Sequence, residues 1–173
     1  MPARKKTSSE PALYEYAVGA LGRRMRSVAE LKRLLRQRAG SEELIDRVIA
    51  RLKQQNYLND ATYATIYSGY RRDNEKFGRL RVVNELKARG VKREVIDEAV
   101  AASYDATDDE QQARAFLRRK RLREPKNQKE VARVFRALAR GGFTRRSIAA
   151  ILKNWEIDEE SLETLENEDE SSE

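Results

Sequence analysis

The chain has 173 residues, of which 39% are hydrophobic and 38% charged, and its formal net charge is +7. It contains no cysteine, which excludes disulfides, thiolate metal sites and cysteine nucleophiles. It contains no histidine either, which removes imidazole ligands and the usual general base near neutral pH. Paired carboxylates or an activated lysine stay open, but no pattern singles them out among 29 acids and 36 bases. We therefore expect no enzymatic activity, no cofactor and no metal site.

The composition favours α-helix and gives almost no support to strands. Only three residues are proline, and the abundant Ala, Leu, Arg, Lys and Glu side chains lose little rotamer freedom in a helix. The apolar content suits several small amphipathic cores better than one thick core. Residues 1–11 are polar and basic, unlike a secretory signal, and no stretch approaches the roughly 18 apolar residues of a membrane span. We expect a cytoplasmic protein with a disordered segment at 1–11.

Residues 12–57 are predicted to form three helices. Ser27 and Glu30 have the spacing of a capping box, in which each side chain satisfies a backbone N–H at the helix start. Gly40 is suited to ending that helix, and Ser41 to capping the next. The predicted buried faces contain, in helix order, Tyr14, Ala17, Val18 and Leu21, then Val28, Leu31, Leu34 and Leu35, then Leu44, Ile45, Val48, Ile49 and Leu52.

Residues 58–104 repeat this order of three helices, with Asn59 or Asp60 as the first cap. Tyrosine rings can also stack on bases of single-stranded nucleic acid, but the helical spacing of the tyrosines at 63, 67 and 70 favours a core stripe. The predicted buried faces contain Tyr63, Ile66, Tyr67 and Tyr70, then Leu80, Val83 and Leu86, then Val95, Ile96, Ala99 and Val100.

Residues 105–155 contain the last three predicted helices. Thr107 and Glu110 have capping-box spacing, Asn127 begins the second helix, and Thr144 caps the third. The glycine pair 141–142 is expected to stop the middle helix, as Gly90 stops its counterpart.

Self-comparison indicates an internal repeat with a period of about 51 residues. A shift of this size places Leu35 on Leu86 and Ile45 on Ile96, and one further repeat places Gly90 on Gly142. Matches at buried and turn positions together indicate a duplicated helical unit. The predicted fold is all-α, with three tandem three-helix repeats at 12–57, 58–104 and 105–155 that form an elongated, curved array.

Charge is distributed unevenly along the chain. Residues 156–173 contain ten acidic residues and no basic one, so residues 1–155 hold 36 bases against 19 acids. The basic body is expected to attract polyanions, above all nucleic acid or a nucleoprotein. The acidic segment is expected to be disordered because it is too charged to bury a core. One hypothesis is that it folds back over the basic body and weakens non-specific DNA binding.

Two basic runs are the predicted partner-binding residues. Adjacent bases on a helix point in different directions, so some of them are expected to be only solvated. The first run contains Arg71, Arg72, Lys76, Arg79 and Arg81, and the second contains Arg118, Arg119, Lys120, Arg121, Arg123, Lys126 and Lys129.

Five segments resemble the RecX family of regulatory proteins in their order and spacing. They read R-S-V-A-E-L at 26–31, Y-L-N-D-A-T-Y-A at 57–64, K-F-G at 76–78 followed by E-L-K-A-R-G-V at 85–91, and R-G-G-F-T at 140–144. Each segment alone is a weak signal, but together they cover about residues 12–155 in the expected order.

This resemblance implies a protein that binds the filament of the recombinase RecA on single-stranded DNA. Members of the family restrain RecA, lowering its ATP hydrolysis, strand exchange and coprotease activity, which affects DNA repair and the SOS response. We expect a monomer that acts by non-covalent binding, with direct DNA contact as a secondary interaction. The alternative from the basic charge alone is a stand-alone, non-specific DNA-binding helical repeat protein.

Overall fold

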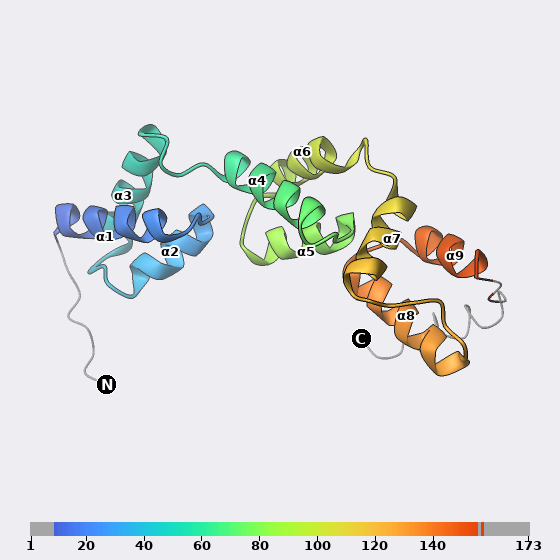
Figure 1. Ribbon diagram of the computed structural model, residues 1–173. Coiled ribbons are helices and arrows are strands. Elements are labelled where there is room, and N and C mark those ends of the chain that lie inside the picture. Colours follow the sequence, from blue (N-terminus) through green and yellow to red (C-terminus); the bar gives the residue numbers. More distant parts are fainter. Residues whose placement is uncertain (1–8, 156, 158–173) are drawn as a thin grey trace. The chain divides into compact units, whose positions relative to one another are not determined.

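The computed structural model describes residues 9–155 and residue 157, which contain nine α-helices and no β-strand (Figure 1). The all-α prediction is therefore confirmed for this part of the chain. No helix in these residues is both long enough and apolar enough to cross a membrane. The predictions for residues 1–8 and for most of the acidic segment lie outside the described residues. The helices are α1 (Glu10–Arg23), α2 (Val28–Arg36), α3 (Glu42–Gln54), α4 (Asp60–Asp73), α5 (Arg79–Ala88), α6 (Arg93–Tyr104), α7 (Asp109–Arg119), α8 (Gln128–Gly141) and α9 (Arg145–Lys153).

The chain divides into two compact units, and the division passes through α4, α5 and α6. Unit 1 comprises Met1–Ile66 and Leu86–Ala99, and unit 2 comprises Tyr67–Glu85 and Val100–Glu173. Each of the three middle helices therefore contributes residues to both units. The division into three repeats at 12–57, 58–104 and 105–155 stays a prediction.

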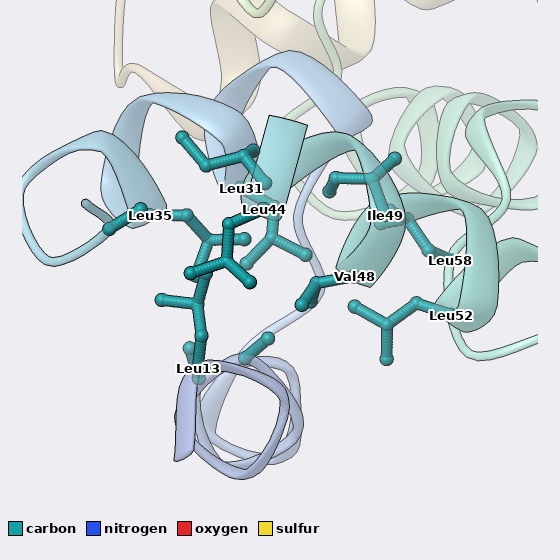
Figure 2. Packing of buried hydrophobic residues seen from close by; sticks show 12 residues of the cluster. Leu13, Leu31, Leu35, Leu44, Val48, Ile49, Leu52 and Leu58 are labelled. Carbon is teal, nitrogen blue, oxygen red and sulfur yellow. The ribbon is translucent and has the colours of Figure 1, made fainter. Parts of the chain in front are cut away.

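The main core of unit 1 lies between α1, α2 and α3, which pack against one another. Figure 2 shows leucine, valine and isoleucine side chains of these helices clustered with Leu58, which follows α3. The predicted faces of α2 and α3 are confirmed at Leu31 and Leu35 and at every position predicted for α3. The buried residues of this core are Leu13, Ala17, Ala20, Leu31, Leu35, Ala39, Leu44, Ile45, Val48, Ile49, Leu52 and Leu58.

The buried face of α1 is rotated from the predicted one. Leu13, Ala17 and Ala20 are buried, whereas Tyr14 and Leu21 are only partly buried. Tyr14 lies at the edge because its hydroxyl donates a hydrogen bond to Gln55. The two alanines carry small side chains, which allow neighbouring helices to approach closely.

Polar groups of three segments meet at the start of α2 in unit 1. Ser27 is fully buried, and its hydroxyl accepts a hydrogen bond from the Glu30 backbone N–H at 3.1 Å and donates one to the Arg89 carbonyl at 2.6 Å. The Glu30 carboxylate accepts a hydrogen bond from the Ser27 N–H at 3.1 Å, which confirms the predicted capping box. Asp60 accepts a hydrogen bond from the Val28 N–H at 2.8 Å. These contacts join the start of α2 to the start of α4 and to the turn after α5.

Unit 2 depends on a close backbone approach between the start of α5 and the end of α8. The Gly78 N–H donates a hydrogen bond to the Gly141 carbonyl at 2.8 Å, and the Leu80 N–H donates one to the Gly142 carbonyl at 3.1 Å. A Cβ atom at Gly78 would lie 2.2 Å from the Gly142 carbonyl oxygen, so only glycine fits there. Gly142 itself has φ +86°, the left-handed region, and ends α8 as predicted.

Three phenylalanine rings pack beside this backbone contact. The ring centroids of Phe77 and Phe116 are 6.0 Å apart, and those of Phe116 and Phe143 are 5.5 Å apart. The Tyr104 hydroxyl donates a hydrogen bond to the Phe77 carbonyl at 2.9 Å, and burial raises the pKa of Tyr104. The segment after α4, the turn after α8 and the face of α7 are thereby held together.

Several predicted core positions in α4 and α5 are wrong. Ile66 and Tyr70 are 51% and 55% exposed, so the predicted α4 stripe is buried at Tyr63 but not along its whole length. In α5 the predicted Leu86 is fully buried, but Val82 is buried in place of Leu80, which is 48% exposed. Two residues of a helix that are two positions apart point about 200° away from each other, so burying Val82 exposes Leu80.

Two predicted helix boundaries also need correction. Gly40 does not have positive φ, and α2 ends earlier, at Arg36. The repeat counterpart of Gly90 is Ala39, so the first repeat lacks a glycine at this turn. The cap of α7 is Asp108 rather than Thr107, because the Asp108 carboxylate accepts the backbone hydrogen bonds. Of the two caps predicted for α4, Asn59 is the one that accepts the backbone hydrogen bonds, and the caps at Ser41, Asn127 and Thr144 are also confirmed.

We predict that Gly78→Ala lowers the free energy of unfolding by about 2 kcal/mol, since the added methyl group overlaps rigid backbone atoms. The matched control is Gly69→Ala in α4, where an added Cβ meets no atom within 4 Å. That substitution is expected to leave stability unchanged or raise it by up to about 1 kcal/mol. Urea denaturation followed by circular dichroism measures both, and equal stabilities would show that the close approach is not required.

Candidate polyanion-binding surface

The second half of unit 2 is strongly basic. Residues 111–155 contain 14 lysines and arginines, but only two acidic residues, Glu124 and Glu130. This segment forms most of α7, the loop after it, α8 and α9, and these three helices pack against one another. Unit 2 therefore presents a high density of positive charge from one compact set of helices.

The second predicted basic run lies at the end of α7 and along the loop to α8. All seven of its side chains are exposed. Arg119 forms an ion pair with Glu75 at 2.9 Å, and the Lys120 ammonium lies 5.7 Å from the centre of the Phe116 ring. Within the described part of the chain, five side chains of this run make no hydrogen bond or ion pair, namely Arg118, Arg121, Arg123, Lys126 and Lys129. These five charges are available to an external anion.

The end of α7 holds a basic residue where glycine is usual. Arg121 has φ +55°, and the Leu122 N–H closes the helix end by donating to the Leu117 carbonyl at 2.9 Å. This is the hydrogen-bond pattern that most often places glycine in the left-handed position. Lys76 of the first run also has positive φ, +59°, and is half-buried.

The arginines of the first predicted run are engaged within unit 2. Arg71 forms an ion pair with Glu85 at 3.0 Å and donates to the Tyr67 hydroxyl at 2.9 Å. Arg81 reaches the other Glu85 oxygen at 3.1 Å, and its guanidinium lies 3.8 Å from the centre of the Phe77 ring.

The other two arginines of this run also have internal partners. Arg72 pairs with Asp73 at 2.7 Å and donates a hydrogen bond to the Ser103 carbonyl, and Arg79 pairs with Asp105 at 2.9 Å. The hydrogen bond between Arg72 and Asp73 is the main cause that lowers the pKa of Asp73. The first run therefore presents less available charge than the second, and its role in partner binding stays a prediction.

Glu85 is the acidic centre of the first run. Burial alone would raise its pKa, but hydrogen bonds from Tyr67 and Arg81, together with the charges of Arg71 and Arg81, outweigh burial. The pKa of Glu85 therefore lies below its usual value, and the carboxylate is ionised at neutral pH.

A row of bases on α8 extends the surface beyond the predicted residues. Lys129, Arg133, Arg136 and Arg140 follow one another at i, i+4, i+7 and i+11, so they lie on one face of the helix. The opposite face carries the buried residues Val131, Val134, Phe135 and Leu138. Of this row only Lys129 belongs to the predicted partner-binding residues, although the spacing of the other three bases is visible in the sequence.

Two hollows that share lining residues lie beside this row. The first has a volume of about 350 Å³ and is lined by Arg81, Phe116, Lys120, Leu122, Arg133, Ala137 and Arg140. The second has a volume of about 510 Å³ and is lined by Asn127, Lys129, Glu130, Arg133, Arg136 and Arg140. Arg133 and Arg140 border both, and we call the two hollows together the α7–α8 groove. Its charged rim can bind phosphate or carboxylate groups.

Two family profiles match most of the first hundred residues. The profile of the first three-helix domain of RecX matches residues 14–52, and the profile of the second three-helix domain of RecX matches residues 59–100. Regulatory protein RecX from Pseudomonas putida KT2440 is 31% identical over 148 residues, which span 86% of this chain and 94% of that protein. The chain belongs to the RecX family. RecX from Deinococcus radiodurans is 35% identical over 151 residues, which span 82% of this chain and 68% of that protein.

Solved RecX structures share this fold. The crystal structure of RecX from Lactobacillus salivarius has a TM-score of 0.67 at 19% identity, covering 85% of this chain and 96% of that one. A second crystal structure, of regulatory protein RecX, has a TM-score of 0.66 at 20% identity, covering 84% and 71%. At this level of identity the likeness supports the fold alone.

The segments that resemble RecX form the contacts that hold each unit. In unit 1 the segments at 26–31, 57–64 and 85–91 meet at the start of α2. In unit 2 the segments at 76–78 and 140–144 form the glycine contact between α5 and α8. The RecX-like motifs therefore maintain the fold, whereas most of the available charge lies outside them.

We predict that a triple variant, Arg118→Gln, Arg123→Gln and Lys129→Gln, binds single-stranded DNA more weakly and with less salt dependence. Each lost phosphate contact lowers the slope of log affinity against log salt by about 0.7. The matched control removes three exposed charges from unit 1 through Lys53→Gln, Lys87→Gln and Lys92→Gln. Fluorescence anisotropy across a salt series measures both slopes, and equal losses would assign the effect to net charge rather than to this surface.

We predict that Glu85→Gln lowers stability at pH 7 and that the difference from the parent protein shrinks in acid. The depressed pKa of Glu85 means that its stabilising contribution is present above the unfolded value of about 4.3 and is lost as pH falls through the folded value. Glu124→Gln, at an exposed position, controls for the change in net charge. Urea denaturation between about pH 3 and pH 7 tests this, and a constant difference would contradict it.

Proposed function

We propose that this RecX-family protein binds the RecA filament on single-stranded DNA and restrains RecA, lowering its ATP hydrolysis, strand exchange and coprotease activity. Membership of the family, with a match across 94% of the Pseudomonas putida relative, is the observation that carries the proposal. In this role the protein acts in the cytoplasm, as a monomer, by non-covalent binding and without catalysis of its own. DNA repair and the SOS response are the processes affected.

The basic surface of unit 2 supports this role on physical grounds. A filament on single-stranded DNA is a nucleoprotein that repeats the same acidic and phosphate groups along its length, and exposed arginines bind such groups through charge-assisted hydrogen bonds. The exposed side chains at the end of α7 and the row on α8 offer many such contacts at once. Binding restrains RecA if the bound filament geometry is one that cannot complete the ATPase cycle.

A second candidate function is stand-alone, non-specific DNA binding. The row of bases on α8 favours this candidate, because a line of positive charge fits a phosphate backbone without any protein partner. The two candidates differ in binding preference. A RecA regulator binds RecA-coated single strands much more tightly than naked single strands, whereas a stand-alone DNA-binding protein prefers naked DNA.

We predict that RecA ATP hydrolysis on single-stranded DNA falls as this protein is added. The titration is made once before filament assembly and once after it, which separates blocked growth from restraint of an existing filament. The triple variant of the second run controls for the basic surface and is expected to need a higher concentration for the same effect. The proposal is wrong if a saturating amount leaves both filament lifetime and ATP hydrolysis unchanged.

A further inference from the structure

The α7–α8 groove has an apolar floor as well as a basic rim. Phe116, Leu122 and Ala137 line its first hollow between Lys120, Arg133 and Arg140. Phosphate groups need the basic rim but gain nothing from an apolar floor. A ligand that combines carboxylates with aliphatic side chains would use both parts of the groove.

The chain itself contains a segment of this composition. Residues 156–173 read E-I-D-E-E-S-L-E-T-L-E-N-E-D-E-S-S-E, with ten acidic residues, no basic residue, and leucines at 162 and 165. The segment begins three residues after the last residue of α9, and α9 packs against α7 and α8 within unit 2. Its charge complements residues 111–155, where 14 bases face two acids.

We propose that residues 156–173 dock in the α7–α8 groove, with Leu162 and Leu165 on its apolar floor and their neighbouring carboxylates on its basic rim. The docked segment competes with nucleic acid for the same arginines. This inference extends the proposed function, because the competition concerns the polyanion contact made by unit 2.

The length of the segment is sufficient for this contact. Eighteen residues in extended conformation reach about 60 Å, whereas the 14 residues of α8 are only about 21 Å long. Tethering also raises the local concentration of the segment to the millimolar range, so weak ion pairs suffice to populate the docked state. Because those ion pairs are exposed to solvent, salt weakens the docking.

Competition of this kind favours partners that make many contacts. A short stretch of naked DNA must displace the segment and gains few phosphate contacts in return. A filament that offers several binding sites to one molecule gains more contact free energy, which offsets the same cost of displacing the segment more easily. The segment therefore acts as an internal competitor that suppresses non-specific DNA binding more than filament binding.

The absence of cysteine allows a direct test by disulfide trapping in the full-length chain. Ala137→Cys combined with Leu165→Cys places one thiol in the groove and one in the acidic segment. The control combines Leu165→Cys with Asn74→Cys, an exposed residue of unit 2 outside the groove. We expect the groove pair to oxidise at least about tenfold faster at about 50 mM salt, and this advantage to disappear near 1 M salt. Equal rates for the two pairs at low salt would overturn the proposal.

Competition is measured separately, with naked single-stranded DNA and no RecA. Replacing the ten acidic residues of the segment by Gln or Asn in the full-length chain is expected to raise DNA affinity about tenfold at low salt and to steepen the salt dependence. Leu162→Ser with Leu165→Ser keeps all ten charges and is expected to give part of that gain. If only the charge change has an effect, the segment acts by long-range repulsion and the docking proposal fails.

These outcomes are independent of the proposed function. A chain that has no effect on RecA would still give the disulfide and the change in DNA affinity if the segment docks. Conversely, a RecA regulator whose segment does not dock would show neither the faster disulfide nor an effect of the two leucine substitutions on DNA affinity. A protein that binds no DNA in any variant would still report docking through the disulfide.

Discussion

The basic surface depends on the place where the backbone of Gly78 contacts the backbone of Gly141 and Gly142. Two backbone hydrogen bonds join the two segments, and a Cβ atom at Gly78 or Gly142 would overlap the backbone of the other segment. The contact fixes the end of α8 against the start of α5, and the ring of Phe116 from α7 packs beside it. The Arg81 guanidinium adds a hydrogen bond to the Arg140 carbonyl at 3.0 Å. Since the same helices carry the exposed bases, the direction in which α8 presents its charged row follows from a contact made mainly by backbone groups.

The residues that identify the family and the residues available to a partner are largely different. Ser27, Glu30 and Asp60 satisfy buried backbone groups at the start of α2, where loss of a partner would leave a donor or acceptor without its hydrogen bond. Exposed bases such as Arg118 and Arg123 hold no other part of the described structure in place. Substitution of these exposed bases is therefore expected to leave the helix contacts unchanged.

Local chemistry made much of this fold predictable. The caps at Ser27, Ser41, Asn127 and Thr144 depend on a side chain and a backbone group only three residues apart, so the sequence contains the whole interaction. Exposure of Tyr70 and Leu80 was not predictable in this way, because burial depends on which helix covers each face. The same holds for Arg71, because its partner Glu85 lies in the next helix, whereas the pair of Arg81 with Glu85 has i, i+4 spacing within α5 and is visible in the sequence. The row on α8, by contrast, is visible in the sequence from the i, i+4, i+7 and i+11 spacing of its bases, but it is not a run of consecutive bases.

The left-handed backbone at Arg121 and Lys76 has a consequence for directed evolution. Holding a side chain other than glycine in this conformation costs about 1 kcal/mol, yet both positions carry a cation. Selection for heat resistance alone would replace each of them with glycine and would discard two positive charges from unit 2. Heat-tolerant variants obtained in this way would have a less strained backbone but a weaker electrostatic attraction to an anionic partner. A screen for heat resistance should therefore be run together with one for partner affinity.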